Sequence, residues 1–145
     1  MKARRIIFLT FSITAIISAL AIVQAASSTH DGVYTDAQAK QGETLYTNQC
    51  AMCHGAQLQG AGQNPALAGP AFVQNWSGQT VADLYTQIQT TMPAIKPGSL
   101  KPDEVSQVIA YILSANKYPA GKTELPNSVD ALKAIQFDAP ASGGQ

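Results

Sequence analysis

The sequence predicts an all-α domain of three or more short helices joined by long loops. Three observations support this fold class. Apolar residues recur at helical spacing in three separate stretches. Each stretch follows or begins with a residue typical of helix N-termini, namely Thr35, Thr80 or Pro102. Between the first two stretches, glycine and proline interrupt any periodicity from 55 to 79.

The first helix is predicted from Asp36 to about Asn48. Thr35 can cap it, with Gln38 as the reciprocal partner of a capping box. The residues at helical spacing within it are Ala39, Gly42, Leu45 and Tyr46. The helix runs directly into Cys50.

The second helix is predicted from 81 to about 90, with Thr80 as N-cap and Asp83 at the capping-box position. The loop before it, 55–79, is unusually long for a compact domain unless another group organises it.

The third helix is predicted to begin near Pro102 and to end near Asn116. Its apolar stripe is the strongest in the chain and consists of Val105, Val108, Ile109, Ile112 and Leu113. Beyond Tyr118, prolines and a glycine rule out a continuous helix, although 129–135 can form a short turn that packs back onto the domain. We expect 139–145 to be disordered.

The N-terminus has the organisation of an export signal. A basic start is followed by an apolar stretch, 6–23, and by small residues at Val23-Gln24-Ala25. We therefore predict a signal peptide over 1–25, with an uncleaved N-terminal membrane anchor as the alternative. The rest divides into a linker (26–34), a domain (35–118) and a C-terminal extension (119–145) that is partly disordered. Both a cleaved signal peptide and an uncleaved anchor would place the domain outside the cytoplasm. The domain would then be periplasmic, either free or anchored to the membrane.

The net charge of zero conceals a mildly acidic domain. The leader holds three of the nine basic residues, so six lysines face nine acidic residues after it, a charge near −3. No basic run predicts nucleic-acid binding. A partner with a basic or mixed docking patch is weakly favoured.

The run Cys50-Ala51-Met52-Cys53-His54 is the attachment signature of c-type haem. Two thiols in one turn can form thioethers with the two vinyl groups of one porphyrin, and the following histidine can bind the iron. A zinc site lacks ligands, because the chain has two cysteines and two histidines. A thioredoxin-like pair lacks its βαβ context, whereas a plain disulfide remains an alternative in an exported chain.

Candidates for the opposite axial ligand are few. Met52 lies inside the attachment turn, and His30 lies in the predicted linker. Met92 follows the second helix in a segment stiffened by Pro93 and Pro97, and its thioether is a soft ligand suited to haem iron. We therefore predict His54 and Met92 as axial ligands of one covalent haem c.

Together with 50–54, the segments 64–69, 91–93 and 108–112 resemble class I (mitochondrial-like) cytochromes c over roughly 34–118. The segments 97–100 and 116–121 look similar to monohaem cytochromes that accompany periplasmic quinoprotein dehydrogenases. In the family motif glycine often precedes the proline, where this chain has Asn64.

The resemblance implies a cytochrome c fold, with loops wrapped around the haem. Gly42 and Tyr46 would cross the last helix at Val108 and Tyr111. The haem pocket would include Tyr46, Pro65 and Trp76, with the Pro65 carbonyl accepting from His54 Nδ1–H and Trp76 contacting a propionate.

We accordingly expect an electron-transfer protein rather than an enzyme, working between a redox donor and acceptor in the periplasm. A periplasmic dehydrogenase and a terminal oxidase are candidate partners. After the leader the chain has no Arg, and its second histidine is His30, so a distal acid–base group is lacking. The alternatives are a haem subunit fixed in a larger dehydrogenase or oxidase complex, and a gas-sensing module in which Met92 is displaced.

Overall fold

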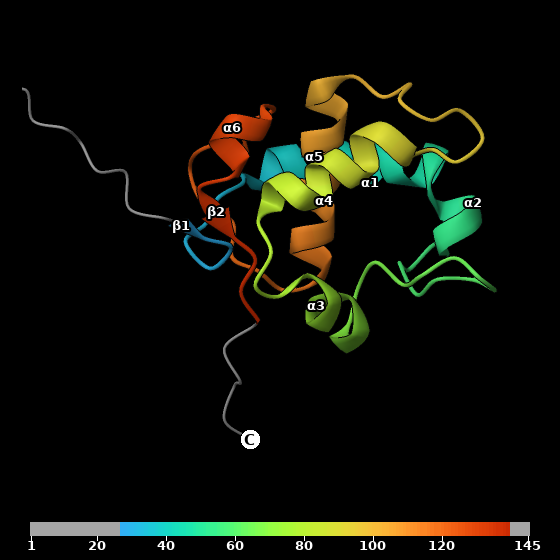
Figure 1. Ribbon diagram of the computed structural model, residues 1–145, viewed down its shortest axis with the longest axis horizontal. Helices are drawn as coiled ribbons and strands as arrows, with labels where there is room; N and C mark the ends of the chain where they lie inside the picture. The colour runs from blue at the N-terminus through green and yellow to red at the C-terminus, as the bar shows by residue number, and fades with distance from the viewer. Residues whose placement is uncertain (1–26, 140–145) are drawn as a thin grey trace, which may run out of the picture.

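The computed structural model describes residues 27–139, which form six helices and two short strands. The elements are β1 (Ser27–Ser28), α1 (Asp36–Gln49), α2 (Ala51–His54), α3 (Pro70–Trp76), α4 (Val81–Thr91), α5 (Pro102–Ala115), α6 (Val129–Leu132) and β2 (Ile135–Gln136). Figure 1 shows α1, α4 and α5 in the centre, with α2 at one end and α6 with the strands at the other. The all-α prediction is confirmed.

The crossing of α1 and α5 is the main helix–helix contact of the fold. Gly42 lies at the point of closest approach: a Cβ on this residue would come within 1.8 Å of the Gln107 carbonyl oxygen. Next to it, the Tyr46 and Tyr111 rings pack with centroids 5.3 Å apart. The predicted crossing is confirmed at Tyr111, whereas the α5 backbone nearest to Gly42 is that of Gln107, the residue before the predicted Val108. Glycine is required because two backbones meet there.

The start of α1 confirms half of its predicted capping box. The Thr35 hydroxyl accepts a hydrogen bond from Gln38 N at 3.1 Å. The Gln38 side chain, however, does not turn back to Thr35. Its amide pairs with the backbone of Leu125, donating to the carbonyl at 2.9 Å and accepting from the N–H at 2.7 Å. Gln38 is buried, and Leu125 satisfies both ends of its amide.

The long loop predicted over 55–79 contains a helix that the sequence prediction missed. α3 starts after Gly69, whose φ of 93° suits glycine, and Pro70 occupies the first turn, where its missing N–H costs nothing. The loop before α3 is tied to the end of α5 by the buried Asn116. Its side-chain oxygen accepts from Gly69 N at 2.9 Å, and its amide donates to Leu67 O at 3.0 Å.

The predicted second and third helices are confirmed as α4 and α5. The Thr80–Asp83 capping box is present at the start of α4. α5 begins at Pro102 and ends one residue before Asn116, and its whole predicted stripe is buried.

The segment predicted as a linker, 26–34, differs from the structure over its described part. β1 pairs in parallel with β2, with Ser27 opposite Ile135. Thr29 is fully buried, and the Tyr34 hydroxyl donates to Tyr118 O at 2.6 Å. Because these residues bury surface and pair their polar groups, this stretch belongs to the folded domain. The predicted leader, 1–25, lies outside the described residues.

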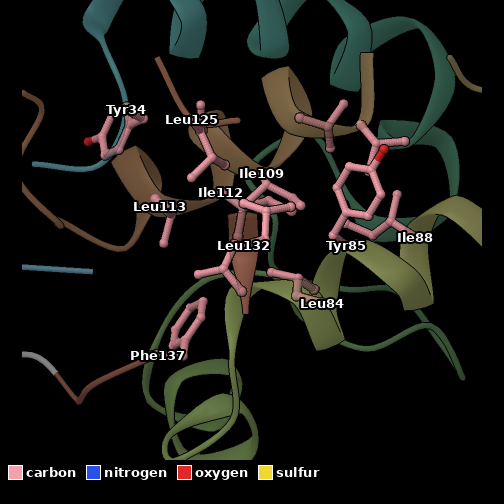
Figure 2. Packing of buried hydrophobic residues seen from close by; sticks show 14 of the residues in the cluster. Tyr34, Leu84, Tyr85, Ile88, Ile109, Ile112, Leu113, Leu125, Leu132 and Phe137 are labelled. Atoms are coloured by element: carbon pink, nitrogen blue, oxygen red, sulfur yellow. The ribbon is translucent and has the colours of Figure 1, made fainter. Parts of the chain in front are cut away.

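The C-terminal extension packs back onto the domain, as predicted for 129–135. Leu125, Leu132 and Phe137 are almost completely buried. Figure 2 shows Leu132 and Phe137 in one apolar cluster with Leu84 of α4. Residues 140–145, where we predict disorder, lie outside the described part. Within residues 27–139 no helix is long and apolar enough to span a membrane.

Replacing Gly42 by Ala tests the crossing. The added methyl group would collide with backbone atoms of Gln107, so we expect a loss of about 3 kcal/mol in the free energy of unfolding, measured by urea titration. Gly62→Ala is the control, because its Cβ would have no neighbour within 4 Å. It carries only the strain of a left-handed backbone, about 1 kcal/mol. Equal losses would contradict the close crossing.

Candidate functional site

A cavity of about 420 Å³ lies between α2, α3, α4 and α5. The sequence-predicted site residues that line it are Cys50, Cys53, His54, Pro65, Trp76 and Met92. They come from segments as far apart as the end of α1 and the end of α4. The fold thus brings together six of the seven residues that we predicted, and the seventh, Tyr46, lies outside the lining.

The attachment segment, Cys50–His54, forms one helical turn directly after α1. Cys50 ends α1, and its carbonyl oxygen accepts hydrogen bonds from Cys53 N at 3.1 Å and His54 N at 2.9 Å. Gly55 then terminates the turn with a φ of 81°. One turn therefore presents both cysteines and the histidine to the same cavity.

Both cysteines carry free, half-buried thiols. Burial, followed by the nearby Cys53, raises the pKa of Cys50 to about 11. This is the opposite of a thioredoxin-like cysteine, whose pKa is lowered to make a reactive thiolate. Among residues 27–139 no group of three or more His, Cys, Asp or Glu side chains could hold a metal ion. The raised pKa of Cys50 therefore disfavours the thioredoxin-like dithiol interpretation.

His54 is buried and has one ring nitrogen already engaged. Its Nδ1 lies 2.9 Å from the Pro65 carbonyl oxygen. A carbonyl can only accept, so Nδ1 carries the proton and donates. In the neutral ring Nε2 is then the nitrogen with the lone pair, and this tautomer is the one that binds a metal through Nε2.

Met92 lies at the C-terminal end of α4, where the chain turns from helix to extended backbone. Its N–H still donates to Ile88 O at 3.0 Å, so its position depends on that of α4. The side chain lines the same cavity as His54.

Trp76 and Tyr46 differ in their relation to the cavity. Trp76 lines it from α3 and packs on Phe72, with ring centroids 6.2 Å apart. Tyr46 is buried and does not line the cavity. Its hydroxyl donates to Gly55 O at 2.6 Å. Burial, with Cys50 as the next cause, raises the pKa of Tyr46 to about 12. Tyr46 thus stabilises the end of the attachment segment through the hydrogen bond to Gly55.

The cavity has no charged wall. Its 23 lining residues include no Asp, Glu, Lys or Arg. The polar ones at its rim are amides, namely Gln49, Asn64, Asn75, Gln79 and Gln87. Two exposed apolar side chains, Met52 and Ile95, are also part of the lining, each 83% exposed.

Comparison with known proteins decides the family. The family described as cytochrome C oxidase, cbb3-type, subunit III matches residues 37–112, just over half of the chain. Cytochrome c-554(547) of Halothiobacillus neapolitanus is 32% identical over 92 residues, covering 61% of this chain and 87% of that protein. This chain belongs to the cytochrome c family.

Two further relatives of this cytochrome differ in size. Cytochrome c6 of Diacronema lutheri is 32% identical over 76 residues, which cover 50% of this chain and 90% of that protein. The cbb3-type cytochrome c oxidase subunit CcoP of Azospirillum brasilense is 36% identical over 92 residues, 52% of this chain. The match covers 30% of that subunit, so the cytochrome spans under a third of this relative's length.

The residues around the cavity of this cytochrome fit a haem c. Two free thiols, an imidazole whose Nε2 has a lone pair, and a thioether meet in one space. The apolar part of the lining comes largely from the core, with Leu84, Ile88 and Ile112. A porphyrin requires such a surface, and its iron requires these soft and borderline ligands.

Two residues that support the site were not predicted from the sequence. Asn116, which ties α5 to the loop carrying Pro65, reads in the sequence as an ordinary helix end. Phe137 packs against Phe72, with ring centroids 5.8 Å apart, and lies between the predicted turn 129–135 and the tail 139–145, so no role was predicted for it. Phe137 follows the predicted turn 129–135 closely, and this proximity was the available signal.

Replacing Tyr46 by Phe tests the support of the attachment segment. The change removes the hydrogen bond to Gly55 O and leaves that carbonyl without this donor, so we expect a loss of about 1 kcal/mol in the free energy of unfolding. Tyr111→Phe is the matched control, because its ring packs on Tyr46 and no hydroxyl hydrogen bond is found for it within the described residues. Similar losses in both variants would contradict this role.

Proposed function

We propose that this cytochrome carries one electron at a time on a single covalent haem c, with His54 and Met92 as axial ligands. Cys50 and Cys53 would hold the haem through thioethers. The observation that carries the proposal is the convergence of both thiols, the His54 ring and the Met92 side chain on one cavity, with His54 Nδ1 already bound to Pro65. The pair of cysteines in the chain is enough for one haem.

Bound haem would supply a one-electron couple, and the chain sets its surroundings. The Pro65 carbonyl fixes the His54 ring and increases the basicity of Nε2. Met92, as a thioether ligand, favours the reduced iron and raises the reduction potential. The buried side chains of α4 and α5 exclude water from this side of the cavity.

Electron transfer is favoured over catalysis by the lining. Chemistry on a bound substrate needs an acid–base group near the iron, and the lining holds no ionisable side chain besides His54 and the two cysteines. Gas sensing would need Met92 to leave the iron. The second candidate function is that of a haem subunit fixed in a larger complex, since one relative is named as an oxidase subunit.

We place the protein in the periplasm, free or anchored through the predicted leader. Its donor and acceptor would be redox proteins, with a periplasmic dehydrogenase and a terminal oxidase as the candidates. The uncharged rim changes our expectation of how they dock. A basic docking patch on a partner would meet amide and apolar groups at the cavity mouth, so an uncharged partner surface fits better.

Replacing Met92 by Ala tests the axial ligand. We expect the reduced variant to bind carbon monoxide and its reduction potential to fall by about 0.1–0.3 V, because the iron loses its thioether. Visible spectra with and without carbon monoxide, together with a redox titration, measure both effects. Met52→Ala is the matched control, since Met52 is 83% exposed on the attachment turn. Unchanged spectra and potential in Met92→Ala would exclude Met92 ligation.

The uncharged rim predicts weak salt dependence of electron exchange. Above about 100 mM salt a charge is felt only within about 10 Å, so the rim rather than the net charge of the domain decides the rate. We expect the oxidation rates of the reduced protein by ferricyanide and by cobalt(III) tris(phenanthroline) to change less than about threefold between about 100 and 500 mM salt. Ile95→Lys places a cation on the rim and should make the ferricyanide rate fall roughly tenfold over the same range. A wild-type dependence as steep as that of Ile95→Lys would rule out docking through an uncharged mouth.

A further inference from the structure

The end of the C-terminal extension is hydrogen-bonded to the connection between α3 and α4. Phe137 N donates to Gln79 O at 2.8 Å, and Gly78 N donates to Phe137 O at 2.9 Å. An antiparallel bridge joins Gln136 to Thr80, the N-cap of α4. The backbone of 136–137 therefore fixes the point where α4 begins.

The Phe137 side chain supports the cavity wall on α3. It is completely buried and meets Phe72 edge to face, with ring centroids 5.8 Å apart. Phe72 in turn packs on Trp76, and both line the cavity. Phe137 itself is not part of the lining, so any effect that it has on the cavity passes through Phe72 and the 78–80 connection.

The extension also holds the flank of α4. The Tyr85 hydroxyl donates to Asn127 O at 3.1 Å, and α6 packs against α4. Leu132 and Phe137 belong to the same apolar cluster as Leu84, with Leu132 drawn between the other two in Figure 2, and Leu84 lines the cavity. α4 is about 16 Å long and has Met92 at its far end. A helix of this length moves as a unit, so a change at its start or flank reaches Met92.

We propose that residues 127–138 position the methionine side of the haem site, with Phe137 as the positioning residue. The segment lies outside residues 37–112, which the family match covers, so family membership does not imply this role. The inference rests on the proposed ligation by His54 and Met92. Without the Phe137 ring, Phe72 and the 78–80 connection lose their backing. α4 then shifts more freely, and Met92 leaves the iron more often.

Phe137→Ala tests this role, with Leu125→Ala as the matched control. Leu125 belongs to the same C-terminal extension and is similarly buried, but its backbone pairs with Gln38 of α1. Among the described residues no hydrogen bond joins Leu125 to α4 or to the 78–80 connection, in contrast to Phe137. In Figure 2 Leu125 lies well away from Phe137. Three quantities are measured on each haem-loaded protein: the rate of carbon monoxide binding to the reduced form, the reduction potential and the thermal unfolding midpoint.

We expect both variants to unfold at lower temperature, because both leave a cavity in the core. Only Phe137→Ala should bind carbon monoxide roughly tenfold faster than the wild type and show a lower potential. Leu125→Ala should stay within about twofold of the wild-type rate. Equal rates in the two variants, whether unchanged or raised together, would overturn the positioning role.

Two further results keep the test decisive. If Phe137→Ala does not accumulate as folded protein, Phe137→Leu replaces it, and a rate equal to that of Leu125→Ala overturns the proposal. Measurements on the wild type distinguish a failure of the positioning role from a failure of the proposed Met92 ligation. Rapid carbon monoxide binding by the wild type would refute Met92 ligation, and the positioning role with it. A wild type that resists carbon monoxide, beside an equally resistant Phe137→Ala, would refute the positioning role alone.

Discussion

The contact between α1 and α5 is the constraint on which the rest of the structure depends. Because Gly42 has no side chain, the two helices approach until backbone nearly meets backbone. This crossing fixes both helix ends that matter to the site. Cys50 ends α1 and starts the attachment turn, while Asn116 ends α5 and holds the loop that carries Pro65. His54 and its hydrogen-bond acceptor are thus placed by the same pair of helices.

The opposite side of the cavity is built differently. Met92 depends on α4, which follows a connection held by the last described residues of the chain. The histidine side needs one local turn and one loop, whereas the methionine side needs long-range packing. Such a division lets the two halves differ in rigidity: the attachment turn is nearly fixed, while the methionine half follows the packing of the extension.

The sequence was sufficient for the elements with strong local signals. Capping residues and apolar spacing located α1, α4 and α5 to within one or two residues, because local physics and the tertiary structure agree there. α3 was missed because its seven residues lie among glycines and prolines that hide a short helix. Gln38 and the 27–34 segment were misjudged for a common reason. Gln38 and Leu125 are 87 residues apart, and Ser27 and Ala134 are 107 apart, so no local sequence pattern could predict these contacts. Tyr46 was predicted to line the haem pocket, but it does not line the cavity. Its helical spacing is clear in the sequence, whereas the direction in which its side chain points is determined by the crossing of α1 and α5.

The pairing of β1 with β2 has a consequence for how the domain assembles. The Ser27 hydroxyl and the Ala134 carbonyl that it meets are 107 positions apart in the chain. Contacts between distant positions carry a large loop-closure entropy and form late, after local helices and the α1–α5 pair have shortened the effective loop. The seam between the two strands is therefore expected to be the last part to close and the first to open. During refolding, protection of its amides from hydrogen exchange would therefore mark the completion of the fold.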